Sequence, residues 1–403
     1  MTFPRGLRAL NQPEYRRFFG AQLVAQIGSW MQSVSQAWLV LQLTDSPLLL
    51  GLIGTLQFGP VLLFSIFSGA VADRFVKRRI LIATQTTLAC QAVGLGALAW
   101  SGHAEYWHVA ALAMALGFAN VIEMPARQSY VADIVGRADL INAVALNSAS
   151  FNAARIVGPA VAGVMIAKLG VVPAFFINGV GHLVVVAALF TLTTTGQPAS
   201  RSITGVLADI AEGVRHALST PRIRLLLGLL FVVSFSVFNF SVYVPLLAKS
   251  VLGLGAEGFG YLMAALGVGA VAGALTVGAS SGREPSITTM FLEATLACGG
   301  LFLMFAVRHV AVAAAMLVLI GYAGTMLVAT CNTALQLAAP DELRGRIMSL
   351  YVLIWGGSFP IGAFIVGAIS EAWGVPRAFG VMGGFGLATL LALSVWWRLR
   401  RSA

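Results

Sequence analysis

Charged side chains are scarce in this chain of 403 residues. Asp, Glu, Lys and Arg make up 10% of it, whereas hydrophobic residues make up 58%. A soluble globular domain carries about a quarter charged residues, so the composition argues against a soluble protein. The formal net charge is +10, but the basic residues are scattered between apolar runs and form no continuous basic face. We therefore expect a membrane protein with membrane lipids, and no nucleic acid, among its partners.

Sequence signals for metals, cofactors and catalysis are also missing. No CxxC pair or Cys/His cluster occurs around the three cysteines, so we expect no disulfide framework, no metal site and no cofactor. No Gly-Lys-Ser/Thr sequence occurs, so ATP is not the evident energy source and a proton gradient is the natural alternative. His182 stands alone in an apolar segment with no nucleophile partner by spacing. These absences predict that the protein is not an enzyme.

What the chain has in abundance is long apolar segments. A bilayer core requires about 20 apolar residues per helix. Turn residues and charges delimit twelve such segments. In the fourth and tenth segments the helix can extend beyond the lipid. Their limits are 17–42, 47–72, 78–100, 107–127, 140–167, 171–192, 223–249, 257–280, 286–306, 309–336, 346–371 and 376–398. The predicted fold is an all-α, multi-pass membrane protein with twelve transmembrane helices.

The basic residues predict the orientation of these helices. Most of the 25 Lys and Arg residues fall on the side that holds both termini and the polar stretch 193–222. Arg155 lies within a span, and the opposite side holds only Lys168, Lys249, Arg308 and Arg377. Because positive loops stay in the cytoplasm, both termini are predicted to be cytoplasmic. An amphipathic piece around Leu207 to Leu218 predicts a linker helix on the membrane surface.

The two halves of the chain resemble each other. Three glycines of the first half recur at a constant offset of 204 residues; the pairs are Gly158 and Gly362, Gly163 and Gly367, Gly170 and Gly374. This repeat predicts two pseudo-symmetric six-helix bundles joined by a linker. The predicted domains are 1–192, the cytoplasmic linker 193–222 and 223–403.

The loop after the second span carries the most specific motif. Gly69, Asp73, Arg74 and Arg78 follow the spacing Gly-x-x-x-Asp-Arg-x-x-(Lys/Arg)-(Arg/Lys), which resembles the signature loop of the major facilitator superfamily. The resemblance implies a gating loop that latches the two halves in the outward-facing state. The alternative is a plain positive-inside determinant. Val76 departs from the motif, because the family usually has Gly there.

Shorter runs resemble one branch of that superfamily. Pro125 to Arg127 and Leu343 to Ser349 are similar to segments of the drug:proton antiporters, which include the enterobactin exporter and macrolide efflux proteins. Gly158 to Gly163 resembles the fifth-helix antiporter motif, with Ala162 in place of a Gly. The resemblance implies a monomer in the bacterial inner membrane that exchanges protons for a small-molecule substrate.

Three charged residues are candidates for proton coupling. Glu123 and Arg127 form an i, i+4 pair at the end of the fourth span, where Glu123 is either a titratable carboxylate or one partner of a static salt bridge. Arg155 shares a helical face with Ser148 and Asn152. Because a lone Arg is costly in lipid, Arg155 either lines a wet cavity, pairs with Glu123 or reaches the cytoplasmic surface.

Polar and aromatic residues at helical spacing are candidates for a substrate cavity. They are Gln22, Gln26, Trp30, Ser148, Asn152, Phe235, Asn239, Tyr243 and Trp355. An aromatic wall with a few polar contacts suits amphipathic organic molecules, although interhelical hydrogen bonding and ordinary packing explain the same pattern. Glu293, in the ninth span, is expected to have a structural partner on a neighbouring helix.

The sequence thus predicts a proton-coupled secondary exporter of hydrophobic or amphipathic organic compounds that works by alternating access. Two alternatives remain open. One is a dedicated exporter of a siderophore or another anionic metabolite, with Arg155 as the counter-charge. The other is a lysophospholipid transporter.

Overall fold

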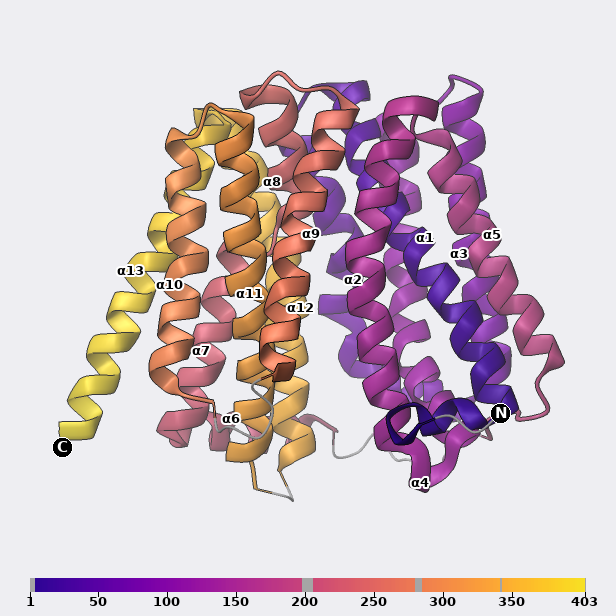
Figure 1. The fold of residues 1–403 in the computed structure, drawn as a ribbon. Coiled ribbons are helices and arrows are strands. Elements are labelled where there is room, and N and C mark those ends of the chain that lie inside the picture. Colours follow the sequence, from indigo (N-terminus) through magenta and orange to yellow (C-terminus); the bar gives the residue numbers. More distant parts are fainter. Residues whose placement is uncertain (1–3, 198–205, 280–284, 341–342, 403) are drawn as a thin grey trace. The chain divides into compact units, whose positions relative to one another are not determined.

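The computed structural model describes residues 4–197, 206–279, 285–340 and 343–402, which form helices and no strand. Residues 198–205 of the predicted linker lie outside the described part. The principal helices are α1 (Pro13–Thr44), α2 (Pro47–Arg74), α3 (Lys77–Trp100), α4 (Tyr106–Leu169), α5 (Val172–Thr191), α6 (Val206–Ser219), α7 (Pro221–Ser236), α8 (Phe240–Leu246), α9 (Ala256–Ala279), α10 (Ile287–Leu303), α11 (Val310–Ala338), α12 (Arg344–Trp373) and α13 (Val375–Ser402) (Figure 1).

Each of the twelve predicted spans lies mainly in helix, which confirms the predicted all-α fold class. Eleven segments of the described chain are long and apolar enough to cross a membrane. α1 is long enough but too polar to qualify, because it carries the glutamines 22, 26, 32 and 36. The protein is therefore a multi-pass membrane protein whose first helix is unusually polar.

Helix α4 contains two predicted spans in one element of 64 residues. Helical backbone continues past the predicted end at 127, and the direction changes at Gly136, which has φ of 68°. A side chain is unfavourable at such a positive φ, so glycine suits this corner. Tyr130 and Ala143, on either side of the corner, both lie near the start of α1, where they contact Phe18 and Tyr15.

The predicted seventh span is interrupted. α7 ends at Ser236, α8 begins at Phe240, and a π-helical turn follows at Leu247–Val251. The freed carbonyl groups at the break find side-chain donors, because Asn239 Nδ2 donates to the Phe235 carbonyl (2.8 Å) and Tyr243 donates to the Ser236 carbonyl (2.9 Å). The break therefore satisfies its backbone within the protein, as non-helical backbone at membrane depth must.

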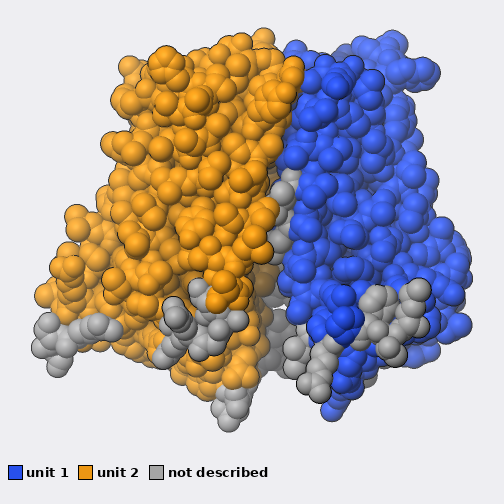
Figure 2. All heavy atoms as spheres, in the orientation of Figure 1, with its two compact units in different colours: residues 1–44, 59–203 blue, residues 45–58, 204–403 orange. Residues whose placement is uncertain are grey.

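The chain forms two compact units, coloured separately in Figure 2. Unit 1 comprises residues 1–44 and 59–203, and its helices α1, α3, α4 and α5 pack against one another. A short 3-10 helix, Arg5–Asn11, is fastened to α4 by an ion pair of Arg8 with Asp139 (2.6 Å) and by the Ala9 amide, which donates to Asn142 Oδ1 (2.8 Å).

Unit 2 comprises residues 45–58 and 204–403, so the first part of α2 groups with α12, whereas the sequence led us to expect it in the N-terminal bundle. Glycine explains the close approach: a Cβ on Gly367 would lie 2.7 Å from the Pro47 carbonyl oxygen. Glu371 of α12 accepts hydrogen bonds from the Ser46 hydroxyl (2.8 Å) and the Leu48 amide (3.2 Å).

The sequence repeat has a structural counterpart within each unit. A Cβ on Gly158 would lie 2.5 Å from Trp30 Cβ of α1, and a Cβ on its repeat mate Gly362 would lie 2.5 Å from Asn239 Nδ2, at the junction of α7 and α8. Gly170 and Gly374 both cap a helix with positive φ, 78° and 87°. In these two pairs the glycines occupy equivalent places in the two units: a close helix approach and a helix C-cap.

The linker is held at both of its described ends. In unit 1, Glu14 accepts hydrogen bonds from the backbone and hydroxyl groups of Thr193 and Thr194, and Tyr130 donates to the Thr194 carbonyl (2.7 Å). Burial alone would raise the pKa of Glu14, but these hydrogen bonds lower it to about 2. In unit 2, α6 packs against α7 and α12, where Glu212 pairs with Arg346.

Candidate functional site

The candidate site is built around Glu123, whose side chain is buried in unit 1. Only 5% of the residue is exposed, and Oε1 accepts hydrogen bonds from Arg127 Nε (2.9 Å) and Gln85 Nε2 (3.2 Å). One helical turn separates the two charged residues on α4, so the spacing alone brings them together. The guanidinium balances a carboxylate that would otherwise be an isolated charge among apolar side chains.

A second titratable group is joined to this pair through Gln85. The amide of Gln85 donates to Glu123, and its Oε1 lies 2.6 Å from Nδ1 of His182 on α5. His182 is 6% exposed. Gln85 therefore links a buried carboxylate to a buried imidazole through one amide group.

The hydrogen-bonded chain continues from His182 into α1. His182 Nε2 lies 3.4 Å from the Ser29 hydroxyl, which also donates to Asn178 Oδ1 (3.2 Å). Asn178 Nδ2 donates to Gln32 Oε1 (2.7 Å), and Gln32 Nε2 donates to Gln91 Oε1 (3.0 Å). We call the set Glu123, Arg127, Gln85, His182, Ser29, Asn178, Gln32 and Gln91 the polar network.

Glycine 28 makes the α1–α5 part of this network possible. A Cβ there would lie 2.9 Å from the Cα of Asn178, closer than real Cβ atoms approach, so only glycine lets α5 come this near to α1. The sequence showed the polar face of α1 and the lone His182. It could not show that α3 supplies Gln85 and Gln91, because pairing between distant helices leaves no local spacing signal.

The other unit 1 candidates lie outside the polar network. Gln26 accepts a hydrogen bond from Ser150 (3.3 Å), and Trp30 stacks edge-on against Phe151 with ring centroids 5.8 Å apart. Gln22 is buried, whereas Ser148 is exposed and Arg155 is half-buried. The side chain of Asn152 lies outside the described part. The structure thus leaves the predicted roles of these residues as predictions.

The unit 2 candidates fall into two groups. Asn239 and Tyr243 are buried and serve the break between α7 and α8, and the Tyr243 ring stacks on Phe379 at a centroid distance of 5.0 Å. Phe235 and Trp355 are half-buried, and Phe235 stacks on Phe231 at 5.5 Å. Packing accounts for every one of these contacts, so a cavity role for them stays a prediction.

The predicted gating loop is described only in part. Gly69 and Asp73 are helical, the side chain of Asp73 lies outside the described part, and Arg74 is exposed. Arg78 donates to the Phe190 carbonyl oxygen (3.2 Å). Lys77 of the same loop, whose partner the sequence did not identify, is 4% exposed and pairs with Asp133 of α4 at 2.6 Å. This ion pair fastens the loop to the helix that carries Glu123.

Glu293 is the second buried carboxylate within the membrane-spanning helices. It is 4% exposed, and Oε2 accepts a hydrogen bond from the Thr330 hydroxyl of α11 (2.9 Å). Oε1 has no hydrogen-bond partner within the described residues. The expected partner on a neighbouring helix is therefore confirmed. Within the described residues, no group of three or more His, Cys, Asp or Glu side chains is arranged to hold a metal ion.

Comparisons with known proteins agree with this architecture. The family model described as transmembrane secretion effector matches residues 5–402. The multidrug efflux pump Tap of Mycolicibacterium fortuitum is 28% identical over 378 residues, which are 89% of this chain and 90% of that one. The enterobactin exporter EntS of Shigella boydii serotype 4 (strain Sb227) is 26% identical over 401 residues, covering 97% and 94% of the two chains.

The fold is also found among solved structures. A bacterial homolog of the human lysosomal transporter Spinster, in an inward-facing and occupied conformation, superimposes with a TM-score of 0.76. The match covers 98% of each chain at 14% identity. At this identity the likeness concerns the fold alone. The family model, which matches residues 5–402, is the finding that confirms the resemblance to the major facilitator superfamily.

Proposed function

Because this chain belongs to the transmembrane secretion effector family of major facilitator transporters, we propose that it is a proton-coupled exporter of hydrophobic or amphipathic organic compounds. The observation that carries the proposal is the buried Glu123–Arg127 pair within the polar network. A carboxylate at this depth is expensive to keep, and intramembrane ionisable residues mark proton and substrate paths.

In this mechanism Glu123 exchanges its bond to Arg127 for a proton. While ionised, Glu123 is held by Arg127 and Gln85 at 2.9 and 3.2 Å. Protonation removes the charge attraction, which frees Arg127 to move and leaves Gln85 to rearrange toward His182. Alternating access requires helices that have two arrangements, and the protonation state of Glu123 would select between them.

The remaining expectations belong to the same proposal. We place the protein in the bacterial inner membrane as a monomer, with both termini in the cytoplasm, as the basic loops indicate. The bundles 1–192 and 223–403 would rock about the linker 193–222, and the loop from Gly69 to Arg79 would latch them. The predicted cavity residues, with Arg155, would face the substrate.

Export of a siderophore or another anionic metabolite is a second candidate. It is favoured by the similarity to the enterobactin exporter over 97% of this chain. Arg155 would then supply the counter-charge to the substrate. A lysophospholipid substrate is the third candidate, and uptake of labelled lipid that persists in the presence of an uncoupler would favour it.

The test is transport by the purified protein in proteoliposomes under an imposed pH gradient. Dyes, macrolides and catecholate chelators are offered one at a time. The proposal predicts that dye or macrolide transport follows the gradient and stops when an uncoupler collapses it. Transport that is indifferent to the gradient contradicts it. Loss of chelator transport alone in Arg155→Ala would favour the anionic-metabolite candidate, whereas equal loss of all substrates would assign Arg155 a structural role.

A further inference from the structure

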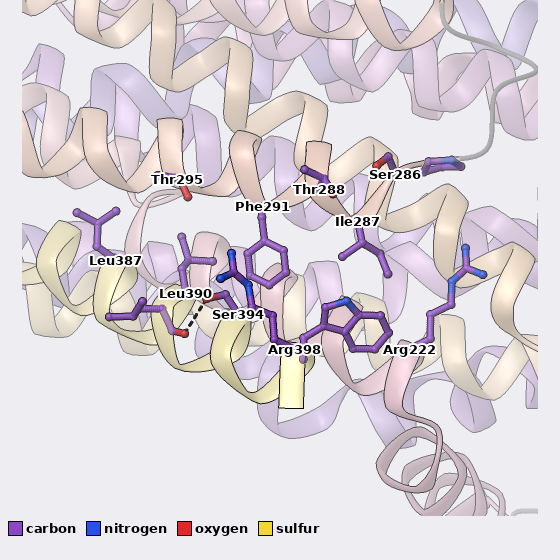
Figure 3. Close-up of a pocket in the computed structure, with 13 residues that line it drawn as sticks. Arg222, Ser286, Ile287, Thr288, Phe291, Thr295, Leu387, Leu390, Ser394 and Arg398 are labelled. Atoms are coloured by element: carbon purple, nitrogen blue, oxygen red, sulfur yellow. Dashed lines mark hydrogen bonds between the residues drawn. The ribbon is translucent and has the colours of Figure 1, made fainter. Parts of the chain in front are cut away.

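Polar side chains converge in unit 1, whereas the two arginines that line a pocket of unit 2 lie apart. That pocket, of about 900 Å³, is bounded by α7, α10 and α13, and Figure 3 shows Arg222 and Arg398 at separate places along it. In unit 1, His182 Nδ1 lies 2.6 Å from Gln85 Oε1, and Gln85 Nε2 lies 3.2 Å from Glu123 Oε1. His182 is therefore a buried titratable group one amide away from the carboxylate of the proposed proton exchange.

The ionised state of Glu123 fixes the direction of these hydrogen bonds. A carboxylate only accepts, so the Gln85 group that lies 3.2 Å from Glu123 Oε1 must be the amide NH2 group. The amide oxygen of Gln85 then faces His182 Nδ1 at 2.6 Å. Because this oxygen also only accepts, the chain of donors and acceptors assigns a proton to Nδ1 of His182.

The imidazole of His182 is held mainly from the Gln85 side. Its other nitrogen, Nε2, lies 3.4 Å from the Ser29 hydroxyl oxygen. That oxygen also lies 2.9 Å from the Ala25 carbonyl oxygen and 3.2 Å from Asn178 Oδ1. A hydroxyl has one proton to donate, and the Ala25 carbonyl is its nearest acceptor. The short bond from Nδ1 to Gln85 is therefore the contact that orients both the ring and the amide.

The charge bonded directly to this amide comes from α4. Helix α5, which carries His182, packs against α1, α3 and α4. The charged residues of α1 and α3 lie at the starts of those helices, at 14–17 and 77–79. On α4, Arg127 shares Glu123 Oε1 with Gln85. The other charged residues of α4 that come after Glu123 lie near the corner at Gly136 or beyond it; they are Asp133, Arg137, Asp139, the half-buried Arg155 and Lys168.

We propose that His182 is a positioning residue for proton exchange at Glu123. Its Nδ1–H group holds the Gln85 amide so that the NH2 group stays directed at Glu123 while Arg127 is away, and the carboxylate keeps one donor when its proton leaves. Without the imidazole donor the amide is free to turn over and place its oxygen against the carboxylate, where two acceptors face each other. This role rests on the proposed function, since it matters only if Glu123 exchanges protons.

Nitrogen NMR of the full-length protein, labelled at histidine and held in lipid bilayers, tests the protonation of the ring. The difference between the spectra of the wild type and His182→Asn isolates the His182 signals. We expect Nδ1 to be protonated in the wild type, and this preference to be lost in Gln85→Leu, which lacks the amide. An Nδ1 without a proton in the wild type, or an unchanged signal in Gln85→Leu, would overturn the proposal. The spectrum requires no transport, so it reports on the amide bridge even if the proposed function fails.

The rate of proton release when a dye binds to the purified protein tests the role itself. His182→Leu has no donor for Gln85, so we expect release to slow about tenfold, the value of one hydrogen bond to a charged group. His182→Asn offers an N–H group close to the position of Nδ1–H and should retain most of the rate. The matched control is Val185→Ala, about one turn along α5, which truncates a buried side chain but removes no hydrogen-bonding group. It should release protons at the wild-type rate despite a lower melting temperature.

Glu123→Gln, measured in parallel, separates this role from the proposed function. Normal release by that variant rejects the proposed function and the positioning role with it. Loss of release by Glu123→Gln together with a wild-type rate in His182→Leu rejects the positioning role alone. Equal slowing in His182→Leu and Val185→Ala would also reject it, because lost stability would then explain the effect. If His182→Leu does not fold, Gln85→Leu takes its place, and a wild-type rate there overturns the proposal.

Discussion

Among the described residues, each unit of the protein buries one carboxylate in its spanning helices, and the two carboxylates have different surroundings. Glu123, in unit 1, meets the guanidinium of Arg127 and an amide that leads on to His182. Glu293, in unit 2, meets the neutral hydroxyl of Thr330. The carboxylate of Glu123 is thus held by an ion pair and an amide, whereas the carboxyl group of Glu293 has one hydrogen bond, from a neutral hydroxyl.

The same contrast extends beyond the carboxylates. The polar network of unit 1 connects α1, α3, α4 and α5 through side chains alone. Around α7 in unit 2 the buried side chains are mainly Leu and Val, and the buried Asn239 and Tyr243 bond to backbone. Within the described residues, unit 1 thus holds a buried ion pair joined to a side-chain network, whereas the buried Asn239 and Tyr243 of unit 2 serve a helix break.

The largest effect is expected from Glu123→Gln. This change keeps the shape of the side chain and removes the exchangeable charge, so efflux of dyes from cells should fall to the level of cells that lack the protein. Accumulation assays at matched expression measure it. Glu293→Gln is the matched control, since it makes the same change in unit 2. If Glu123→Gln exports dye as well as this control does, the proposed difference between the two carboxylates is wrong.

A reversible loss of transport is expected from a disulfide cross-link between α2 and α12. Helix α2 belongs to both units, and a Cβ on Gly54 would lie 3.0 Å from the Cβ of Ala363. Disulfides need a Cβ separation of about 3.8 Å, so Gly54→Cys with Ala363→Cys should cross-link after a small adjustment. In a background with the three native cysteines replaced, oxidation should stop transport and a reductant should restore it. Full activity of the oxidised protein would show that this contact never has to open.

A partial loss is expected from His182→Asn. Asparagine keeps a polar group beside Gln85 but cannot take up a proton, so the pH dependence of transport should shift while export continues. The substitution leaves buried hydrogen-bonding groups without good partners, which lowers the free energy of unfolding by about 1–3 kcal/mol. A lower melting temperature would show this loss. An unchanged pH profile with the same loss of stability would make His182 a packing residue.

A small effect is expected from Glu293→Gln itself. The amide still accepts the hydrogen bond from Thr330, so the free energy of unfolding should change by no more than about 1 kcal/mol and transport should persist. Thermal denaturation and the efflux assay measure both quantities. Complete loss of efflux would move the proton site to unit 2.

The smallest effect is expected at the linker. The pKa of Glu14 is lowered to about 2 from its usual 4.5, so its bonds to Thr193 and Thr194 add stability above about pH 4.5 and lose it as the pH falls toward 2. Glu14→Gln should lower the stability by about 1 kcal/mol at neutral pH and flatten its decline in acid. A melting temperature that falls equally in both proteins between pH 4.5 and 2 would contradict this role.

The sequence predicted the helices and the family because both leave local signals. Apolar length marked the spans, and the i, i+4 spacing paired Glu123 with Arg127. It allowed the fourth helix to continue beyond the lipid but did not predict the corner at Gly136, and it did not predict the break after Ser236, where apolar residues run on without interruption. Gln85 and Lys77 were missed because their partners lie on another helix, 38 and 56 residues away.

Proton exchange at Glu123 is the step on which the proposed transport cycle depends. The decisive measurement is the release of protons into weakly buffered solution when a transported dye is added to the purified protein. We predict that the wild type and Glu293→Gln release protons on binding and that Glu123→Gln binds the dye without release. Unaltered proton release from Glu123→Gln would contradict the central claim.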